Sequence, residues 1–191
     1  MLGRGYIPRL VIDTAYKIIS QLSGPILDVG CGNGELLYRL KNNFEIKGIG
    51  LDISEAELSL ARKKSIPVVR GDAFYLPFKD ASFNVVLCFN TLYNFPDLTV
   101  LLPIFYEMVR VTAPGGRIIL DLRNRKNPVI TIKYWWHMRK KEFPTIAHNP
   151  SELQNILNKL GCILENKVDV GSKIPIFTWG YIFIFKKDKK C

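Results

Sequence analysis

The sequence contains few of the residues that most often bind metal ions. It has only two histidines, His137 and His148, and its four cysteines are scattered, with no Cys-x-x-Cys pair. Transition-metal sites usually draw on clusters of these two residue types. The sequence therefore predicts no metal site, and it predicts free thiols in a reducing, cytoplasmic environment rather than disulfides.

Long apolar runs are also missing. No stretch approaches the roughly 20 apolar residues that a membrane-spanning helix needs. The first residues lack the apolar segment and the small-residue cleavage site of a secretory signal. Internal repeats and low-complexity linkers are absent too. We therefore expect a cytoplasmic protein without integral membrane association, made of a single domain over residues 1–191.

Acidic residues are outnumbered, with 17 Asp and Glu against 27 Lys and Arg, which gives a net charge of +10. Such a charge favours encounter with anionic partners, such as nucleic acid, an acidic cofactor or a membrane surface. A solvated basic surface without such a partner explains the charge equally well. The charge alone therefore identifies no partner, and the sequence predicts no oligomeric state.

Strand-like apolar runs alternate with helical stripes along the chain. Strands are expected at 25–29, 45–53, 66–70, 83–89, 117–122, 162–169 and 176–185, and helices at 10–22, 35–42, 55–64, 98–112 and from 149 to Gly161. The run Pro114-Gly115-Gly116 is expected to stop the fourth helix. This alternation predicts an α/β fold with a Rossmann-like, doubly wound sheet of seven mostly parallel strands. Because residues 181–185 are apolar at every position, the last strand should lie antiparallel inside the sheet, not at its edge.

A glycine-rich loop, Gly30-Cys31-Gly32-Asn33-Gly34, follows the first expected strand. Loops of this kind bind ligands at the carboxyl ends of parallel strands. A dinucleotide loop has the pattern G-x-G-x-x-G, but Glu35 stands where the third glycine would be. A Walker loop needs Lys and then Ser or Thr after its last glycine, and neither is present. The loop therefore matches neither of these phosphate-binding patterns.

Three carboxylates follow or end successive strands. Asp28 lies two residues before Gly30, Asp52 lies 22 residues after Gly30 at the end of the second strand, and Asp72 follows the third strand. Each one alone has an ordinary explanation as a helix cap or a turn residue. Together they would repel a diphosphate, whereas the position of Asp52 suits a ribose. The ligand they indicate is a nucleoside with a cationic, phosphate-free extension, and S-adenosylmethionine fits this description.

Four segments carry a resemblance to a known family. "LDVGCGNG", "GLDIS", "GDAFYLPFKDASFNVVLC" and "RVTAPGGRIIL" resemble, in order, the motifs of the class I S-adenosylmethionine-dependent methyltransferases, specifically the methyltransferase type 11 group. They cover about residues 25–121. The cofactor-binding residues that the resemblance implies are Asp28, Gly30, Cys31, Gly32, Asp52, Ile53, Asp72, Ala73 and Asn90.

The resemblance also implies a role for most of these residues. The loop residues and Asp28 would line the methionine part of the cofactor, and Asp52 would bind its ribose. Ile53 and Ala73 would contact the adenine ring, and Asp72 would face its amino group. Asn90, at the end of the fourth strand, would hold the methionine ammonium through its backbone carbonyl.

The catalytic candidates follow from the chemistry of this cofactor. The methyl group is already activated, so transfer is an in-line displacement in which a protein base is optional. Tyr93, just after the fourth strand, is the first candidate to contact the acceptor, and its alternative role is that of a packing aromatic. His137 and Tyr6 are further candidates.

In the family resembled, substrate specificity comes from the N-terminal segment and from insertions beyond the fifth strand, and here that insertion is residues 123–148. Asn127 and Pro128 should begin a helix that combines Val129, Ile132, Trp135, Trp136 and Met138 with Lys133, Arg139, Lys140 and Lys141. This segment is interpreted as a lid over an apolar pocket, a nucleic-acid contact, an interfacial helix on anionic lipid, or a helix packed on the domain with a wet basic face.

Three hypotheses for the function remain open. The first is methylation of a small or partly apolar metabolite at O, N or C. The second is modification or binding of RNA, for instance tRNA, through the basic segment 123–141. The third is a cofactor-binding subunit that supports a partner. The N/D-P-P-Y/F signature and the Pro-Cys nucleophile of base-methylating enzymes are absent, which favours the first.

Overall fold

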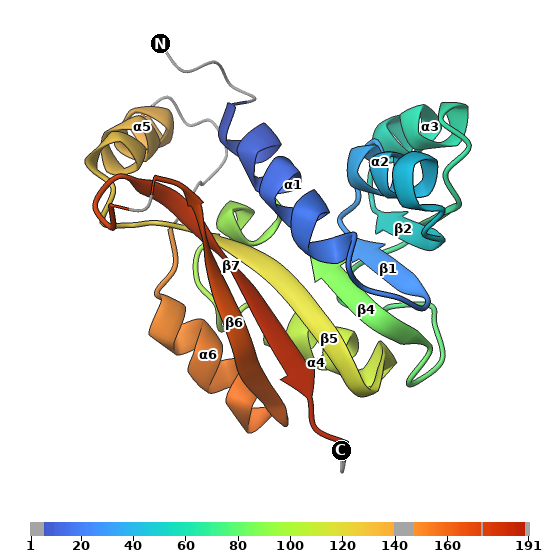
Figure 1. Ribbon diagram of the computed structural model, residues 1–191. Helices are drawn as coiled ribbons and strands as arrows, with labels where there is room; N and C mark the ends of the chain where they lie inside the picture. Colours follow the sequence, from blue (N-terminus) through green and yellow to red (C-terminus); the bar gives the residue numbers. More distant parts are fainter. Residues whose placement is uncertain (1–5, 140–146, 173, 190–191) are drawn as a thin grey trace.

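The computed structural model describes residues 6–139, 147–172 and 174–189. Its strands form one seven-stranded sheet in the order β3-β2-β1-β4-β5-β7-β6 (Figure 1). The strands are β1 (Ile26–Val29), β2 (Gly48–Asp52), β3 (Val68–Arg70), β4 (Phe83–Cys88), β5 (Thr112–Arg123), β6 (Cys162–Gly171) and β7 (Thr178–Lys187). The helices are α1 (Tyr6–Ile19), α2 (Glu35–Phe44), α3 (Glu55–Lys63), the 3₁₀ turn η1 (Leu92–Asn94), α4 (Leu102–Val111), α5 (Pro128–Arg139) and α6 (Pro150–Lys159).

The strand directions confirm the predicted Rossmann-like, doubly wound sheet. β1 pairs parallel with β2 and β4, β2 with β3, and β4 with β5, whereas β7 runs antiparallel to both β5 and β6. β7 lies between two strands, and apolar side chains on both of its faces are buried. Phe183 and Phe185 belong to the core on one face of the sheet, and Ile182 and Ile184 belong to the core on the other.

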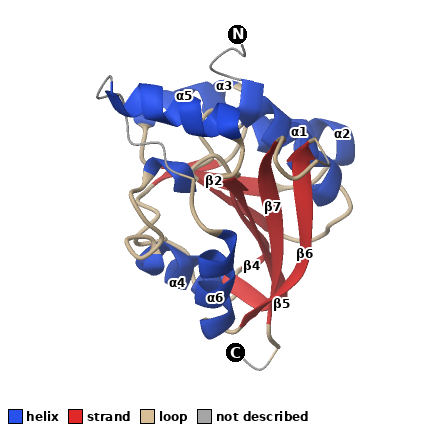
Figure 2. Cartoon of the chain, turned by 90° about the vertical axis from the view of Figure 1, so that its left-hand side faces the viewer, coloured by secondary structure: helices blue, strands red, loops and turns tan. Residues whose placement is uncertain are grey.

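Helices cover both faces of the sheet (Figure 2). α1, α2 and α3 pack on one face, and α4 and α6 pack on the other. The two-residue period of a strand divides its side chains between these layers. In β4, for example, Val86 and Cys88 join the core under α4, while Val85 and Leu87 join the core under α1 and α2. Burial of both faces explains why the strands have apolar runs rather than an alternating pattern.

The fourth helix ends within one residue of its predicted end, but the residues predicted to stop it do not do so. α4 ends at Val111, before Pro114-Gly115-Gly116, and these three residues lie inside β5. The Lys187 ammonium donates hydrogen bonds to the carbonyls of Val109 and Thr112, so a distant strand satisfies the carbonyls at the helix end. The proline and glycines instead accompany a shift in the pairing register between β4 and β5. Within the described residues, no helix has the length and apolar character needed to cross a membrane.

Strand order also places the site. The chain leaves β1 toward β2 on one side, and β4 lies on the other side of β1, so the strand order reverses between β1 and β4. In open parallel sheets a crevice forms at such a point, outside the carboxyl ends of the strands. The register sets Asp28 in β1 beside Gly50 in β2 and Leu87 in β4, so residues far apart in the sequence meet at this edge.

Candidate functional site

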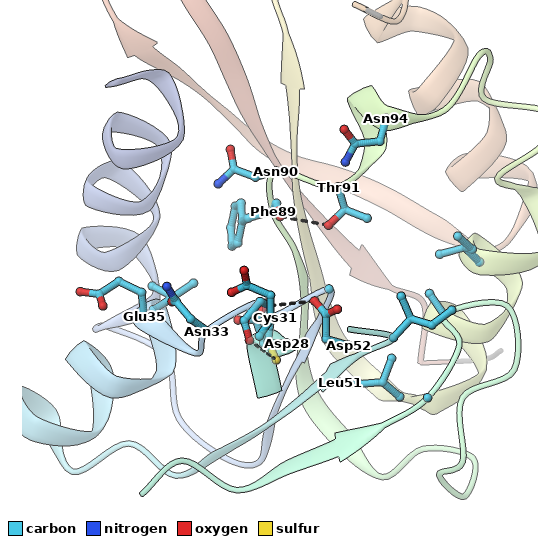
Figure 3. Close-up of a pocket in the computed structure, with 18 of the residues that line it drawn as sticks. Asp28, Cys31, Asn33, Glu35, Leu51, Asp52, Phe89, Asn90, Thr91 and Asn94 are labelled. Carbon is cyan, nitrogen blue, oxygen red and sulfur yellow. Dashed lines mark hydrogen bonds between the residues drawn. The ribbon is translucent and has the colours of Figure 1, made fainter. Parts of the chain in front are cut away.

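A cavity of about 900 Å³ lies at the carboxyl ends of β1, β2 and β4. Figure 3 shows the side chains of Asp28, Cys31 and Asp52 together on its floor, with Phe89 and Asn90 above them. All nine residues expected to bind a cofactor line this cavity: Asp28, Gly30, Cys31, Gly32, Asp52, Ile53, Asp72, Ala73 and Asn90. The wall also includes residues that the sequence did not single out: Pro8, Ile12, Glu57, Phe74, Phe89, Thr91, Asn94 and Phe95.

The glycine loop needs its glycines for two reasons. Gly30, Gly32 and Gly34 all have positive φ angles, of 74°, 52° and 70°, which residues other than glycine rarely adopt. A Cβ atom at Gly30 would also lie 2.5 Å from the Thr91 hydroxyl. The amides of Gly30 and Cys31 both donate to the Leu51 carbonyl, at 2.7 and 3.0 Å. The loop is therefore folded tightly over the end of β2, and its backbone borders the cavity.

Asp52 holds the two loops that flank the cavity. One carboxylate oxygen accepts a hydrogen bond from the Gly32 amide at 2.8 Å, and the other accepts one from the Ser54 amide at 2.9 Å. Ser54 in turn caps α3, because its hydroxyl accepts from the Glu57 amide. Each carboxylate oxygen has a second lone pair that can still accept a ligand hydroxyl. Asp52 therefore combines a structural role with the capacity to bind.

Asp28 is a buried carboxylate facing this cavity. It lies inside strand β1, so it is not a helix cap. Burial, and secondly the negative charge of Asp52, raise its pKa to about 7. A cationic ligand group would favour the ionised form, whereas a phosphate would add a further negative charge. Burial and these same two aspartates also raise the pKa of the Cys31 thiol, so Cys31 remains protonated.

Asp72 and its neighbours form the more open end of the cavity. Asp72 is exposed, and its carboxylate accepts a hydrogen bond from the Phe74 amide at 3.0 Å, as a turn residue does. The Phe74 ring meets the Phe95 ring edge to face, with centroids 6.3 Å apart. Ile53 leaves most of its side chain exposed. This end therefore offers apolar and aromatic surface on which a flat ring can pack.

Asn90 has an unusual backbone that a buried ion pair supports. Its φ angle is 57°, in the left-handed region. Its amide donates to an Asp121 carboxylate oxygen at 2.6 Å, and its side-chain oxygen accepts from Arg123. Asp121 and Arg123 are each only 2% exposed, and their other charged atoms lie 3.1 Å apart. The pair therefore fixes Asn90 from behind the cavity wall.

The sequence analysis missed this pair, although a signal was present. Asp121 and Arg123 alternate with apolar residues near the end of a strand that is otherwise apolar. Two opposite charges two residues apart in a buried strand point to the same face and must neutralise each other or find partners. The contact with Asn90 spans 31 residues to Asp121 and 33 to Arg123, and no local pattern indicates it.

Of the three catalytic candidates, only Tyr93 has its side chain in the described part of the structure. The Tyr93 ring lies against Arg123, whose guanidinium carbon is 4.7 Å from the ring centroid, and Tyr93 does not line the cavity. Burial raises the pKa of Tyr93, against the opposing effect of Arg123, so its hydroxyl stays protonated at neutral pH. His137 lies on α5 and Tyr6 begins α1, and the side chains of both fall outside the described part of the structure. Contact of these residues with an acceptor stays a prediction.

No metal site was found in the described part of the chain, where no group of three or more His, Cys, Asp or Glu side chains is placed to hold an ion. His148, the other histidine, is buried and has a structural contact. Its Nε2 atom lies 2.9 Å from the Leu92 carbonyl oxygen, which joins the start of α6 to the turn η1. The chemistry available at the site is therefore that of carboxylates, amides and apolar walls.

Comparison with known proteins identifies similar sequences. The model of a methyltransferase domain family matches residues 27–120. A demethylmenaquinone methyltransferase from Lactobacillus johnsonii is 36% identical over 132 residues, which make up 63% of this chain and 52% of that protein. A 2-phytyl-1,4-naphtoquinone methyltransferase from Thermosynechococcus vestitus is 32% identical over 130 residues, or 64% of this chain and 56% of that protein. The chain thus spans about half the length of these relatives.

Solved structures share the fold. The magnesium protoporphyrin IX methyltransferase of Synechocystis PCC 6803, solved with bound SAH, superposes with a TM-score of 0.74. The match covers 96% of this chain and 84% of that one, at 17% sequence identity. At that identity the likeness shows the fold, which in that protein binds a nucleoside ligand.

Proposed function

The chain belongs to the S-adenosylmethionine-dependent methyltransferases, and on this premise we propose that it transfers a methyl group from S-adenosylmethionine to a small, partly apolar acceptor of the quinone class. The observation that carries the proposal is the buried Asp28 carboxylate beside Asp52 at the floor of the cavity. Two carboxylates there favour a cationic nucleoside and disfavour a dinucleotide.

The residues present fit such a cofactor. Asp52 has lone pairs left for the ribose hydroxyls, and Asp28 and the backbone of the glycine loop border the place for the methionine part. Ile53, Ala73 and the open aromatic end suit the adenine ring. Asn90 would present its backbone to the methionine ammonium, supported by the Asp121–Arg123 pair. These roles are those that the sequence motifs imply.

The chemistry asks little of the protein beyond position. When bound, S-adenosylmethionine supplies a methyl group that its sulfonium has already activated, so the transfer is an in-line displacement. The chain must hold the acceptor atom about 3 Å from that methyl and exclude water. The apolar wall of Phe89, Phe95 and Ile12 can do both for an acceptor with an aromatic ring. Tyr93 is outside the cavity lining and stays protonated at neutral pH, so on contact with an acceptor it would donate a hydrogen bond and not act as a base.

The acceptor class rests on the apolar wall and on the relatives. Both relatives named above have quinones in their names, and the wall beside α1 and η1 includes the apolar side chains of Pro8, Ile12, Phe89 and Phe95. The RNA alternative has only the basic charge in its favour. No specific contact or motif supports it, so we do not pursue it as a second proposed function.

The proposal is tested by methyl transfer from a labelled donor. The purified protein is incubated with labelled S-adenosylmethionine and, separately, with a reduced short-chain 1,4-naphthoquinone and with total host RNA. Label is expected in the naphthoquinol product and not in RNA. Label in RNA alone, or in neither, would contradict the proposed acceptor class.

Substitution of Ile12 is expected to separate acceptor binding from cofactor binding. Ile12 lies on α1 and lines the cavity together with the apolar side chains of Pro8 and Phe89. A charged side chain there must be desolvated against an apolar acceptor. Ile12→Asp should therefore raise the KM for the naphthoquinol about tenfold or more, which corresponds to about 1.4 kcal/mol. Its affinity for SAH (S-adenosylhomocysteine), measured by calorimetry, should stay unchanged, and a parallel loss of SAH affinity would place Ile12 elsewhere.

The pKa of Asp28 predicts how cofactor affinity depends on pH. Above pH 7 the free carboxyl is mostly ionised and can attract the cationic cofactor, whereas below pH 7 it is mostly neutral and must lose a proton on binding. Affinity for S-adenosylmethionine should therefore fall about tenfold between pH 8 and pH 6. The Asp28→Asn variant should bind more weakly at pH 8 and show a flat profile, and a wild-type profile as flat as that of the variant would contradict the role of Asp28.

The same carboxyl predicts a second effect, on stability without ligand. Because its folded-state pKa lies above the ordinary value for Asp, the stability that it contributes at low pH is lost as pH rises toward 7. Asp28→Asn removes this cost, so the ligand-free variant should unfold at a higher temperature than the wild type at pH 8. Thermal unfolding at pH 8 without ligand checks this, and a lower unfolding temperature for the variant would contradict it.

A further inference from the structure

Exposed apolar side chains gather at one end of the molecule, on two segments far apart in the sequence. Val129 and Ile132 project from α5, and Ile174, Ile176 and Phe177 project from the turn between β6 and β7. Each of these five side chains is at least about half exposed, and Ile132 reaches 66%. We call these five residues the apolar platform. Trp135, one turn further along α5, is also half exposed.

The platform is held in a defined shape. The Asn127 side chain begins α5 by accepting from the amides of Val129 and Ile130, and it donates to the Thr178 carbonyl. Asn124 donates to the carbonyls of Pro175 and Thr178. Two buried asparagines therefore join α5 to the turn before β7, and Figure 1 shows the two segments side by side.

One side of α5 is anchored while the other is exposed. Ile130 is buried, so the helix is already packed on the domain. Val129 and Ile132 are three residues apart and therefore share the outward face. A helix that is merely packed on the domain with a wet basic face would place polar residues here instead. Val129 and Ile132 are thus apolar side chains that lie on the exposed face of α5.

Both segments are free of negative charge. Residues 122–141 and 170–180 contain no Asp or Glu, and they contain eight Lys and Arg residues. Arg125 and Lys126, at the beginning of α5, are exposed. Basic residues around exposed apolar side chains are the combination with which interfacial segments bind anionic lipid, because the charges approach the headgroups while the apolar groups enter the boundary below them.

The platform lies at the same edge of the sheet as the cavity. β5 ends at Arg123, just before α5, and its partner β7 begins at Thr178, with Arg123 paired to Gly180. The carboxyl ends of β1, β2 and β4, where the cavity lies, are at this edge too. A surface to which the platform binds would therefore lie at the same edge of the sheet as the cavity.

We propose that the apolar platform docks this protein on the surface of an anionic lipid bilayer, beside which a lipid-borne acceptor enters the cavity. The second half of this proposal rests on the proposed function, since it needs a lipophilic acceptor. The first half does not, because it follows from the exposed apolar side chains, their rigid support and the absence of acidic residues from the two segments that carry them.

Vesicle flotation tests the docking. The full chain is floated with phosphatidylcholine vesicles that contain or lack phosphatidylglycerol. The wild type should partition to the anionic vesicles and much less to the neutral ones. Ile132→Glu and Phe177→Glu should each weaken this partition about tenfold or more, because each removes an apolar side chain from the boundary and adds a repelled charge. Ile163→Glu is the matched control, since Ile163 is 65% exposed but lies at the opposite end of β6, paired with Lys186.

The outcomes separate this proposal from the proposed function. The platform variants should keep the unfolding temperature, the SAH affinity and the turnover of a short-chain soluble naphthoquinol, while losing turnover of a long-chain quinol embedded in anionic vesicles. A wild type that does not float, that floats equally with neutral vesicles, or that Ile163→Glu weakens as much as Ile132→Glu would overturn the docking proposal. Normal flotation without any methyl transfer would overturn the proposed acceptor class and leave the docking intact.

Discussion

Replacing Asp121 by alanine is expected to lower the free energy of unfolding by about 3–5 kcal/mol, because the substitution leaves the Arg123 charge buried without its partner. Both residues are only 2% exposed, so water cannot take the place of the lost carboxylate. The substitution also removes the acceptor of the Asn90 amide. For a chain of this length the loss corresponds to a fall of about 6–20 °C in the unfolding temperature. Differential scanning calorimetry measures it.

Two further variants distinguish the loss of a charge partner from the loss of position. Removing both charges, as in Asp121→Leu with Arg123→Met, leaves no unpaired ion, so most of the stability should return. In the double variant, the left-handed backbone of Asn90 has lost its contacts with both Asp121 and Arg123. The affinity of the double variant for SAH should therefore be lower than that of the wild type. If Asp121→Ala unfolds at the wild-type temperature, the pair does not hold the fold. If the double variant binds SAH normally, the pair does not position Asn90.

Replacing Asp52 by alanine is expected to weaken SAH binding by about 1–3 kcal/mol, or about 5- to 150-fold. The carboxylate accepts from the amides of Gly32 and Ser54, and both would lose their acceptor while the ribose would lose its own. The glycine loop would also lose its hydrogen bond to the end of β2. Isothermal titration calorimetry measures the change in affinity.

Two variants, Asp52→Asn and Asp72→Ala, serve as controls for Asp52→Ala. Asp52→Asn keeps one acceptor oxygen, so its affinity should lie between those of the wild type and the alanine variant. Asp72→Ala removes an exposed carboxylate with a single turn contact, so its effect should be the smaller one. An Asp52→Ala variant with unchanged affinity, or one affected less than Asp72→Ala, would remove Asp52 from the ribose site.

The site residues that could be predicted from the sequence lie at or next to the ends of strands. Asp28 and Asp52 lie at the ends of apolar strands, and parallel pairing necessarily brings such ends to one edge. The glycine spacing showed which loop borders that edge. Local patterns were enough to find Asp28, Asp52, Asp72 and the glycine loop, whereas Ile53, Ala73 and Asn90, which line the same cavity, came only from the family resemblance. The same logic predicted the position of β7, because a strand that is apolar on both faces cannot lie at an exposed edge.

The remaining features depend on contacts between distant segments, which local patterns do not record. α4 ends where Lys187, 76 residues after Val111, satisfies its carbonyls, and not at the proline and glycines that usually end a helix. Asn90 adopts its backbone because Asp121 and Arg123 lie behind it. The apolar side chains of α5 were visible in the sequence, but their pairing with the turn at 174–177 depends on two asparagine side chains and on the sheet order.

The most direct measurement compares two adenosine-containing ligands, one cationic and one with a diphosphate, in one calorimetric titration series. If Asp28 and Asp52 select a cationic adenosyl ligand, S-adenosylmethionine should bind the purified chain at pH 8 with a dissociation constant in the micromolar range, and NAD should show no binding under the same conditions. Tighter binding of NAD, or no binding of S-adenosylmethionine at any pH, would contradict the assignment of this cavity.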